Sequence, residues 1–350
     1  MNRYYMGTTQ RYRIGGKETQ GKSKRKTQGK PKPKQKPKRK TKPKPQGKNK
    51  EMNREKGSGK GKGNQDDVDS GFTISKCSAG KSINDYTCYD SEALSKLKTL
   101  WNARHPDVKI NTNDDKEIWE ALKYNMSDVC DTEKCWIRQN FAKHKLSDDL
   151  LQYTFAPDSP KTWVKNPNEW LSSLDIEKVM KQYEKKHNNF VFMGPSPIDF
   201  DTHYKYGECV WEELCKFDLM EQIKNNKTNM GFIFNTDPHY SSGSHWISLF
   251  VDVNNNDIFF FDSTGERPPK QVKVLMNRIV SQGKKIGTTY KKIINDNVHQ
   301  KSNTECGMYC LHMIISLLEK KHEPSYFLNH RISDKEMEDL RTEYFNKPSL

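Results

Sequence analysis

Residues 306–320 read CGMYCLHMIISLLEK, and their nearly unbroken apolar character predicts a long buried helix. The helix follows a polar loop, QKSNTE at 300–305. Upstream, strand-like segments occur at residues 190–193, 231–235, 246–253, 257–262 and 288–296, with a helical segment at 268–282. From residue 231 the order is β-β-β-α-β-α, which predicts an α+β domain with a mixed sheet packed against the final helix. We expect this domain to span residues 189–350.

The N-terminal part of the chain has a different composition. Residues 1–64 contain 23 of the 60 Lys and Arg residues but only three of the 45 Asp and Glu residues. This part therefore carries a net charge of +20 and the rest of the chain −5, which together give the net charge of +15. Segments such as PKPKQKPKRKTKPKP at 31–45 cannot bury enough apolar surface to fold. Residues 1–69 are therefore predicted to be a disordered basic tail. It would bind a polyanion such as nucleic acid, an acidic partner or an import receptor, or else only keep the chain soluble.

Residues 70–188 are predicted to form a mostly helical accessory region. Apolar residues recur at three- and four-residue steps at 95–102, 117–126 and 133–141, and residues 174–186 form an amphipathic helix. Its acidic residue near the start and its basic residues at the end suit the helix dipole. The region arranges no nucleophile, base and acid together, so it is expected to pack against the following domain or to present substrate to it.

Cys306 is the candidate nucleophile, because it stands at the start of the apolar helix. A thiol at a helix N-terminus lies at the positive end of the dipole, which favours the reactive thiolate. Gly307 keeps the neighbouring backbone uncrowded, so that amides there can face a substrate carbonyl. Cys310 lies one turn further along and fits a buried core thiol. Burial as a core thiol is also the alternative for Cys306, but its wholly polar upstream loop makes this a poorer fit.

His245 is the candidate base and Asp262 the residue that orients it. His245 ends the loop SSGSH before one strand, and Asp262 follows the next strand, DIFFF. Antiparallel strands joined by a short hairpin bring the two side chains to the same end of the sheet. A thiolate nucleophile needs such an oriented imidazole. His299, seven residues before Cys306, is a rival base that its spacing does not exclude.

Gln300 is the candidate oxyanion donor, six residues before Cys306. A glutamine amide in such a loop can donate to the oxyanion of a tetrahedral intermediate, and a donor of this kind is worth about 10²–10³ in rate. The alternative is an ordinary loop glutamine. The acyl-transfer chemistry that these four residues predict requires no cofactor and no metal.

The other cysteines are interpreted as buried thiols. No secretory leader opens the chain and no apolar run is long enough to span a bilayer, so we expect a soluble, intracellular protein whose cysteines are not a disulfide framework. Cys130 and Cys135 have a spacing compatible with half of a zinc site that Cys77 and Cys88 would complete. The spacings are irregular and no nearby histidine completes the set, so buried thiols are the preferred interpretation.

The order GSHW, FFFDS, HQKSNTECGMYCL resembles the Ulp-type (SUMO-deconjugating) and adenovirus-type cysteine proteases, over roughly residues 190–320. The segments FMGPSPIDFD and NTDPHYSSGSHW further resemble the maturation proteases of large nucleocytoplasmic DNA viruses, of the African swine fever virus type. The resemblance implies the Ulp/adenain-like fold and the roles given above for His245, Asp262, Gln300 and Cys306. It also implies that Trp246, directly after the base, narrows a channel that admits a Gly-Gly substrate backbone.

The resemblance implies a monomeric cysteine endopeptidase that cuts viral structural or core polyproteins after small residues, at Gly-Gly-X sites, during virion maturation. The alternatives are an isopeptidase that removes ubiquitin- or SUMO-like modifiers, and a non-enzymatic nucleic-acid-binding virion protein. The expected location is the virion and the host cytoplasm, in viral factories, with the basic tail offering a route to the host nucleus. No membrane insertion is expected.

Overall fold

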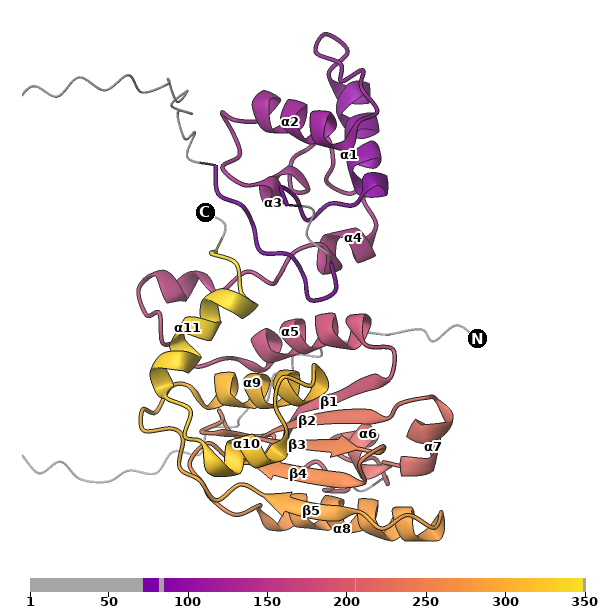
Figure 1. Cartoon of the computed structure of the whole chain (residues 1–350), viewed down its shortest axis with the longest axis vertical. Coiled ribbons are helices and arrows are strands. Elements are labelled where there is room, and N and C mark those ends of the chain that lie inside the picture. The colour runs from indigo at the N-terminus through magenta and orange to yellow at the C-terminus, as the bar shows by residue number, and fades with distance from the viewer. Residues whose placement is uncertain (1–71, 82–84, 205, 349–350) are drawn as a thin grey trace, which may run out of the picture. The chain divides into compact units, whose positions relative to one another are not determined.

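The strand-like segments form a five-stranded mixed sheet in the computed structural model, which describes residues 72–81, 85–204 and 206–348 (Figure 1). The predicted basic tail lies outside the described residues. The sheet order is β1-β2-β3-β4-β5; the outer pairs β1/β2 and β4/β5 are parallel, and the two inner pairs are antiparallel. The strands are β1 (Phe190–Pro197), β2 (Asn229–Asn235), β3 (Trp246–Asp252), β4 (Asp257–Phe261) and β5 (Lys291–Ile294).

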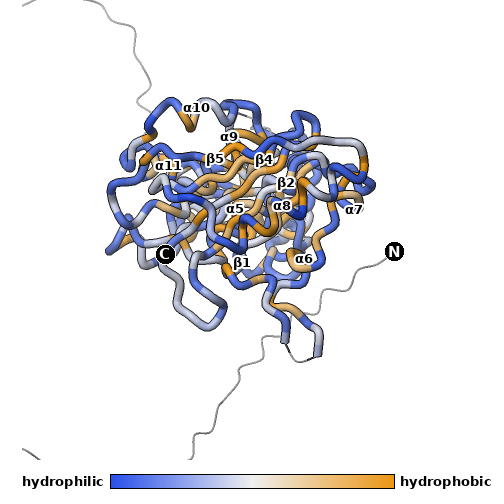
Figure 2. Tube along the Cα trace, turned by 90° about the horizontal axis from the view of Figure 1, so that it is seen from below, coloured by the Kyte–Doolittle hydropathy of each residue, from blue (hydrophilic) through white to orange (hydrophobic). Residues whose placement is uncertain are grey.

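Helices cover both faces of this sheet. One face carries α5 (Ser173–Lys186) and α9 (Cys306–Leu318), and the other carries α6 (Glu212–Cys215), α7 (Leu219–Lys224) and α8 (Lys270–Lys285). Successive side chains of β4 alternate between the two cores, with Phe259 on the α9 side and Phe260 on the α8 side. Each such fully buried side chain stabilises the fold by about 1.5–3 kcal/mol. Figure 2 shows apolar residues concentrated along the strands and the helix faces that cover them.

The C-terminal helices α10 (Pro324–Asn329) and α11 (Asp334–Tyr344) were not predicted. The start of α11 has a readable sequence signal, since Ser333 and Glu336 form a capping box. Met337 of α11 and Phe345 just after it pack into the same core as α9. The chain after the nucleophile helix therefore returns to cover that helix. None of the described helices is long and apolar enough to cross a membrane.

The N-terminal helices have a core of their own. They are α1 (Ser91–Arg104), α2 (Asp115–Asn125), α3 (Glu133–Trp136) and α4 (Asp148–Tyr153). The 3-10 helix η1 (Lys161–Val164) instead contributes Trp163 to the core of the sheet and α9. The helix predicted over residues 133–141 ends early, because three-residue turns replace it after Trp136. Helix α5, although it falls within the predicted accessory range 70–188, shares the core of the sheet and α9. The domain ranges themselves stay a prediction.

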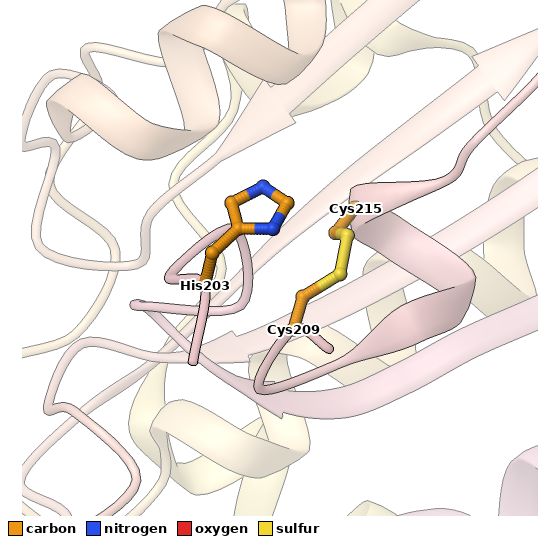
Figure 3. Close-up of side chains that lie close together, drawn as sticks. All are labelled: His203, Cys209 and Cys215. Atoms are coloured by element: carbon orange, nitrogen blue, oxygen red, sulfur yellow. A yellow bond between two sulfur atoms is a disulfide. The ribbon is translucent and has the colours of Figure 1, made fainter. Parts of the chain in front are cut away.

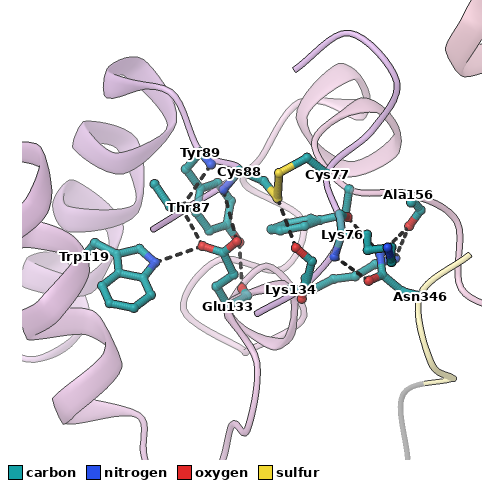
Figure 4. Close-up of a disulfide and its surroundings, with 12 residues drawn as sticks. Lys76, Cys77, Thr87, Cys88, Tyr89, Trp119, Glu133, Lys134, Ala156 and Asn346 are labelled. Atoms are coloured by element: carbon teal, nitrogen blue, oxygen red, sulfur yellow. Dashed lines mark hydrogen bonds between the residues drawn. A yellow bond between two sulfur atoms is a disulfide. The ribbon is translucent and has the colours of Figure 1, made fainter. Parts of the chain in front are cut away.

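The buried carboxylate of Glu133 organises this helical core (Figure 4). It accepts hydrogen bonds from the Thr87 hydroxyl, the Cys88 amide at 3.1 Å and the Trp119 indole at 2.8 Å. These three donors compensate for the burial of the charge. Near the C-terminus, the side chain of Asn346 accepts a hydrogen bond from the backbone amide of Lys76 at 2.7 Å and donates one to the backbone carbonyl of Lys76 at 3.0 Å. The two ends of the described chain are thereby joined.

The prediction that the cysteines outside the site are buried thiols is wrong for six of them. Three disulfides form, and only Cys306 and Cys310 remain free. The fold brings the Cα atoms of each pair to 5.2, 5.6 and 6.5 Å, within the range that a disulfide spans. The alternative zinc site fails too, because its two halves are separate disulfides. The pairs are Cys77–Cys88, Cys130–Cys135 and Cys209–Cys215.

Candidate active site

The sheet positions His245 and Asp262 as the sequence predicts. His245 directly precedes β3 and Asp262 directly follows β4, and these strands are antiparallel neighbours. The His245 Nε2 and Asp262 Oδ1 atoms lie 2.8 Å apart. The carboxylate is almost fully buried, and the same oxygen accepts from the amide and hydroxyl of Thr264 at 2.9 and 2.8 Å. These bonds hold the carboxylate in place, so that it can fix the orientation of the imidazole.

Cys306 is the first residue of α9 and completes the group. Its sulfur is hydrogen-bonded to the His245 side chain. Because Nε2 of the imidazole faces Asp262, Nδ1 is the ring nitrogen left for the sulfur. Burial lowers the pKa of His245, but hydrogen bonds with Asp262 and Cys306, and their negative charges, outweigh burial and raise this pKa from 6.5 to about 10. At neutral pH the imidazole is therefore protonated and can act as the acid that protonates a leaving amine.

This raised pKa predicts an alkaline limit to activity. The value of kcat/KM should fall as pH rises through about 10, when His245 loses its proton. Asp262→Asn removes the negative charge that holds the proton, so the fall should move to lower pH. Rates measured from pH 6 to 11 check this expectation. An alkaline limb at the same pH in both proteins would contradict it.

The same proton links pH to stability. Because folding raises the pKa of His245 above its unfolded value of 6.5, the protonated side chain stabilises the fold fully below that pH. This stabilisation is lost as pH rises through about 10. The wild type should therefore lose, relative to His245→Ala, unfolding free energy as the pH rises from 6.5 to about 10. Denaturant unfolding of both proteins at several pH values measures this difference.

The rival base His299 has a different environment. Its ring is completely buried, and Nδ1 accepts a hydrogen bond from the Ile332 amide at 3.1 Å. Burial lowers the pKa of His299 to about 4, so the ring stays neutral at physiological pH. The structure joins His245, and not His299, to Cys306. Burial also raises the pKa of Cys310 well above its usual range, as expected for an unreactive core thiol.

Gln300 lies in the loop before α9, held by Ser263. The Ser263 hydroxyl donates to Gln300 Oε1 at 2.6 Å, and Gln300 Nε2 donates to the Ser302 carbonyl at 2.8 Å. The first bond fixes which end of the amide is the donor. Since the amide nitrogen carries two hydrogens, the second can be donated to an oxyanion. Ser263 directly follows Asp262, and its hydrogen bond to Gln300 was not predicted.

Loss of the Gln300 amide should lower kcat more than loss of the residue that orients it. Gln300→Ala is expected to reduce kcat by about 10²–10³, as for other oxyanion donors. Ser263→Ala should reduce it by on the order of tenfold, since a net hydrogen bond is worth about 1 kcal/mol. Steady-state kinetics on a cleavable peptide measure both. A Gln300→Ala enzyme that keeps more than half of its kcat would remove Gln300 from the site.

Trp246, the predicted substrate-binding residue, lies beside this group and is nearly buried. Its indole nitrogen donates to the Leu171 carbonyl at 3.0 Å. Leu171 in turn packs against Gly307, where an added Cβ would lie 3.0 Å from the Cβ of the leucine. The segment before α5 thus reaches the start of α9. Leu171 was not predicted, because nothing in its local pattern links it to a strand 75 residues away.

A buried ion pair adjoins the nucleophile and was also missed. Glu305, directly before Cys306, is fully buried and receives two hydrogen bonds from Arg341 of α11, at 2.9 and 3.0 Å. The guanidinium also lies 4.4 Å from the ring centroid of Trp163. Burial raises the pKa of Glu305, while the bonds from Arg341 oppose this rise. The only hint in the sequence is a charged residue at the edge of an otherwise apolar helix.

A family model supports the chemistry that this geometry allows. The model for the Ulp1 protease family, C-terminal catalytic domain, matches residues 214–349. The chain is also 28% identical over 285 residues to a thiol protease of Acanthamoeba polyphaga mimivirus, covering 75% of this chain and 90% of that protein. It is 29% identical over 245 residues to the SUMO-1 cysteine protease of African swine fever virus, covering 66% of this chain and 88% of the relative.

A solved structure supports the fold. The crystal structure of a protease of African swine fever virus superposes with a TM-score of 0.53 at 23% sequence identity, covering 78% of this chain and 96% of that one. The predicted α+β fold, with a mixed sheet packed on the helix that carries Cys306, is confirmed.

Proposed function

We propose that this chain, whose residues 214–349 match the model of the Ulp1 protease family, is a maturation endopeptidase that cuts viral polyprotein precursors at Gly-Gly-X sites. The observation that carries the catalytic assignment is the hydrogen-bonded series Asp262–His245–Cys306. The relatives from mimivirus and African swine fever virus support a viral precursor as the substrate. The match of residues 214–349 to a protease family model argues against the alternative of a non-enzymatic packaging protein.

The proposed mechanism is acyl transfer in two steps. The Cys306 thiolate attacks the scissile carbonyl, and Gln300 with a backbone amide near the start of α9 stabilises the oxyanion. Protonated His245 gives its proton to the leaving amine as the thioester forms. Neutral His245 then takes a proton from water, whose oxygen attacks the thioester carbonyl; the Cys306 thiolate leaves, and the thiolate–imidazolium pair is restored.

Crowding beside the nucleophile supports a preference for small residues before the cut. Leu171 touches Gly307, the residue after Cys306, and also accepts the hydrogen bond that fixes Trp246. Residues without a side chain fit best next to such a group. Trp170, beside Leu171, is 38% exposed and offers an aromatic surface for the substrate backbone.

Two substrate sets test the proposal. Peptides with Gly-Gly-X sites should be cut at least about tenfold faster, by kcat/KM, than matched Ala-Ala-X peptides, because one added methyl group in a confined site costs about 1–3 kcal/mol. Equal rates for both would overturn the specificity. Cys306→Ala supplies the blank for contaminating proteases.

An isopeptidase is the second candidate function, favoured by the name of the African swine fever virus relative, a SUMO-1 cysteine protease. The same catalytic group serves both reactions, so the binding surface decides. A SUMO-conjugated protein cleaved much faster than a Gly-Gly-X peptide of the same scissile sequence would favour the isopeptidase. Faster cleavage of an unfolded precursor segment would favour the endopeptidase.

The basic residues 1–64 are proposed to bind nucleic acid and to keep the protease near packaged genomes. Their net charge of +20 predicts affinity that falls steeply as salt rises, through release of counterions. Binding of the full chain to DNA, compared with a chain lacking residues 1–64, should differ strongly at low salt and converge at high salt. The absence of any such difference would exclude the role.

The proposed location is the virion and the cytoplasmic viral factories of the host, with access to the nucleus through the same basic residues. We propose that the enzyme acts as a monomer, because the residues of its site all come from one chain.

A further inference from the structure

His203, Cys209 and Cys215 form a second cluster, in the segment between β1 and β2. One imidazole nitrogen and the two sulfur atoms lie within 4.8 Å of one another (Figure 3). Within the described part of the chain, no other group of three His, Cys, Asp or Glu side chains has this spacing. None of the three takes part in the proposed catalytic mechanism.

Local structure holds the three side chains together. His203 and Cys209 face each other across an antiparallel bridge, next to a hydrogen bond from the Val210 amide to the Thr202 carbonyl at 3.0 Å. Residues paired across such a bridge project to the same side. Cys215 is the last residue of α6, which begins three residues after Cys209. The backbone therefore preorganises the group before any ligand binds.

We propose that Cys209 and Cys215, once reduced, bind a zinc ion together with His203. Two thiolates and an imidazole are ligands that Zn²⁺ prefers, and a water molecule can fill the fourth tetrahedral position. The disulfide is then the metal-free form of the site. The inference is independent of the proposed proteolytic function.

The disulfide form converts to the zinc-binding form by thiol–disulfide exchange with a dithiol. Two electrons and two protons from a dithiol reductant convert the disulfide to two thiols, and the reductant becomes a disulfide. On binding zinc, both thiols lose their protons, so the two thiolates neutralise the charge of the ion. Among the residues that the structure describes, no third ligand lies at this spacing from the Cys77–Cys88 or the Cys130–Cys135 pair, so reduction there creates no equivalent site.

Either form would brace the loop that carries Tyr204. The Tyr204 hydroxyl, next to His203, lies 3.3 Å from Nε2 of His239, and Nδ1 of that histidine lies 2.7 Å from Asp199. His239 belongs to the segment that leads into His245. A zinc ion would thus preserve, in a reducing cell, the constraint that the disulfide supplies under oxidising conditions.

The test is zinc binding by the full chain carrying Cys306→Ala, so that the nucleophile cannot contribute a ligand. After reduction with dithiothreitol and anaerobic desalting, zinc uptake is measured by competition with a chromophoric chelator. We expect about one zinc ion per chain, and none at this site in the oxidised protein. Cys209→Ser and Cys215→Ser should each abolish binding, and His203→Ala should weaken it on the order of 10–100-fold.

Cys130→Ser is the matched control, because it breaks a disulfide that has no third ligand and should leave zinc uptake unchanged. Cobalt replaces zinc for a second readout: the thiolate-to-cobalt absorption band should vanish with Cys209→Ser. Circular dichroism checks that the variants fold, and the exposed His203→Ala is the variant least able to disturb folding. The proposal is overturned by reduced protein that binds no zinc. It is equally overturned by Cys209→Ser protein that binds as much as its parent.

Discussion

Replacing His245 with alanine is expected to lower kcat/KM by at least about 10³-fold. The variant loses both the side chain that contacts the Cys306 sulfur and the acid that protonates the leaving amine. Its fold should persist, because the imidazole bonds only to Asp262 and to the nucleophile. Kinetics on a Gly-Gly-X peptide, with active sites counted by thiol titration, measure the loss.

His239→Ala is the matched control for that experiment. His239 also pairs with a carboxylate, Asp199 at 2.7 Å, but it has no thiol partner. Its removal should change kcat/KM by less than about twofold, because it lies on the surface. An effect as large as that of His245→Ala would mean that the loss reflects a general disturbance of this end of the sheet.

Arg341→Met is expected to lower the free energy of unfolding by about 3–5 kcal/mol, because it leaves the fully buried Glu305 carboxylate without its partner. The double variant Glu305→Gln/Arg341→Met should recover a large part of this loss, since no uncompensated charge remains. Urea unfolding of the two single variants and the double variant gives the coupling energy.

Lys335→Met on the same helix provides the comparison. Lys335 pairs with Asp339 entirely at the surface, so its removal should leave stability unchanged within error. A similar loss in Lys335→Met and Arg341→Met would show that α11 is sensitive to any change of charge. Additive single variants, with no recovery in the double variant, would contradict the role of the buried pair.

The elements that carry the candidate site could be predicted from local patterns. The apolar run of β4 ends at Asp262, a short hairpin joins β4 to β3, and His245 precedes β3. Strand pairing then brings the two side chains together, whatever the rest of the chain does. The position of Cys306 could also be predicted from neighbouring residues, because a polar loop ends there and an apolar helix begins.

The supporting contacts could not be predicted in this way, because they join segments far apart in the sequence. Leu171 reaches Trp246 across 75 residues, and Arg341 reaches Glu305 across 36. Neither contact leaves a periodic pattern in its own segment. The disulfides were not predicted for another reason. An intracellular, reducing compartment was expected, and this expectation favoured buried thiols despite the short spacing of each pair. His203 lies next to Cys209 and Cys215 because of the β-bridge between His203 and Cys209, which folds this loop.

Labelling by a Gly-Gly vinyl-sulfone peptide tests the central claim, that Cys306 is the nucleophile, most directly. The wild type, Cys306→Ala and Cys310→Ala are treated in parallel, and the modified residue is identified by peptide mapping. We predict a single adduct on Cys306, present in the wild type and in Cys310→Ala and absent from Cys306→Ala. An adduct that persists in Cys306→Ala would contradict the account.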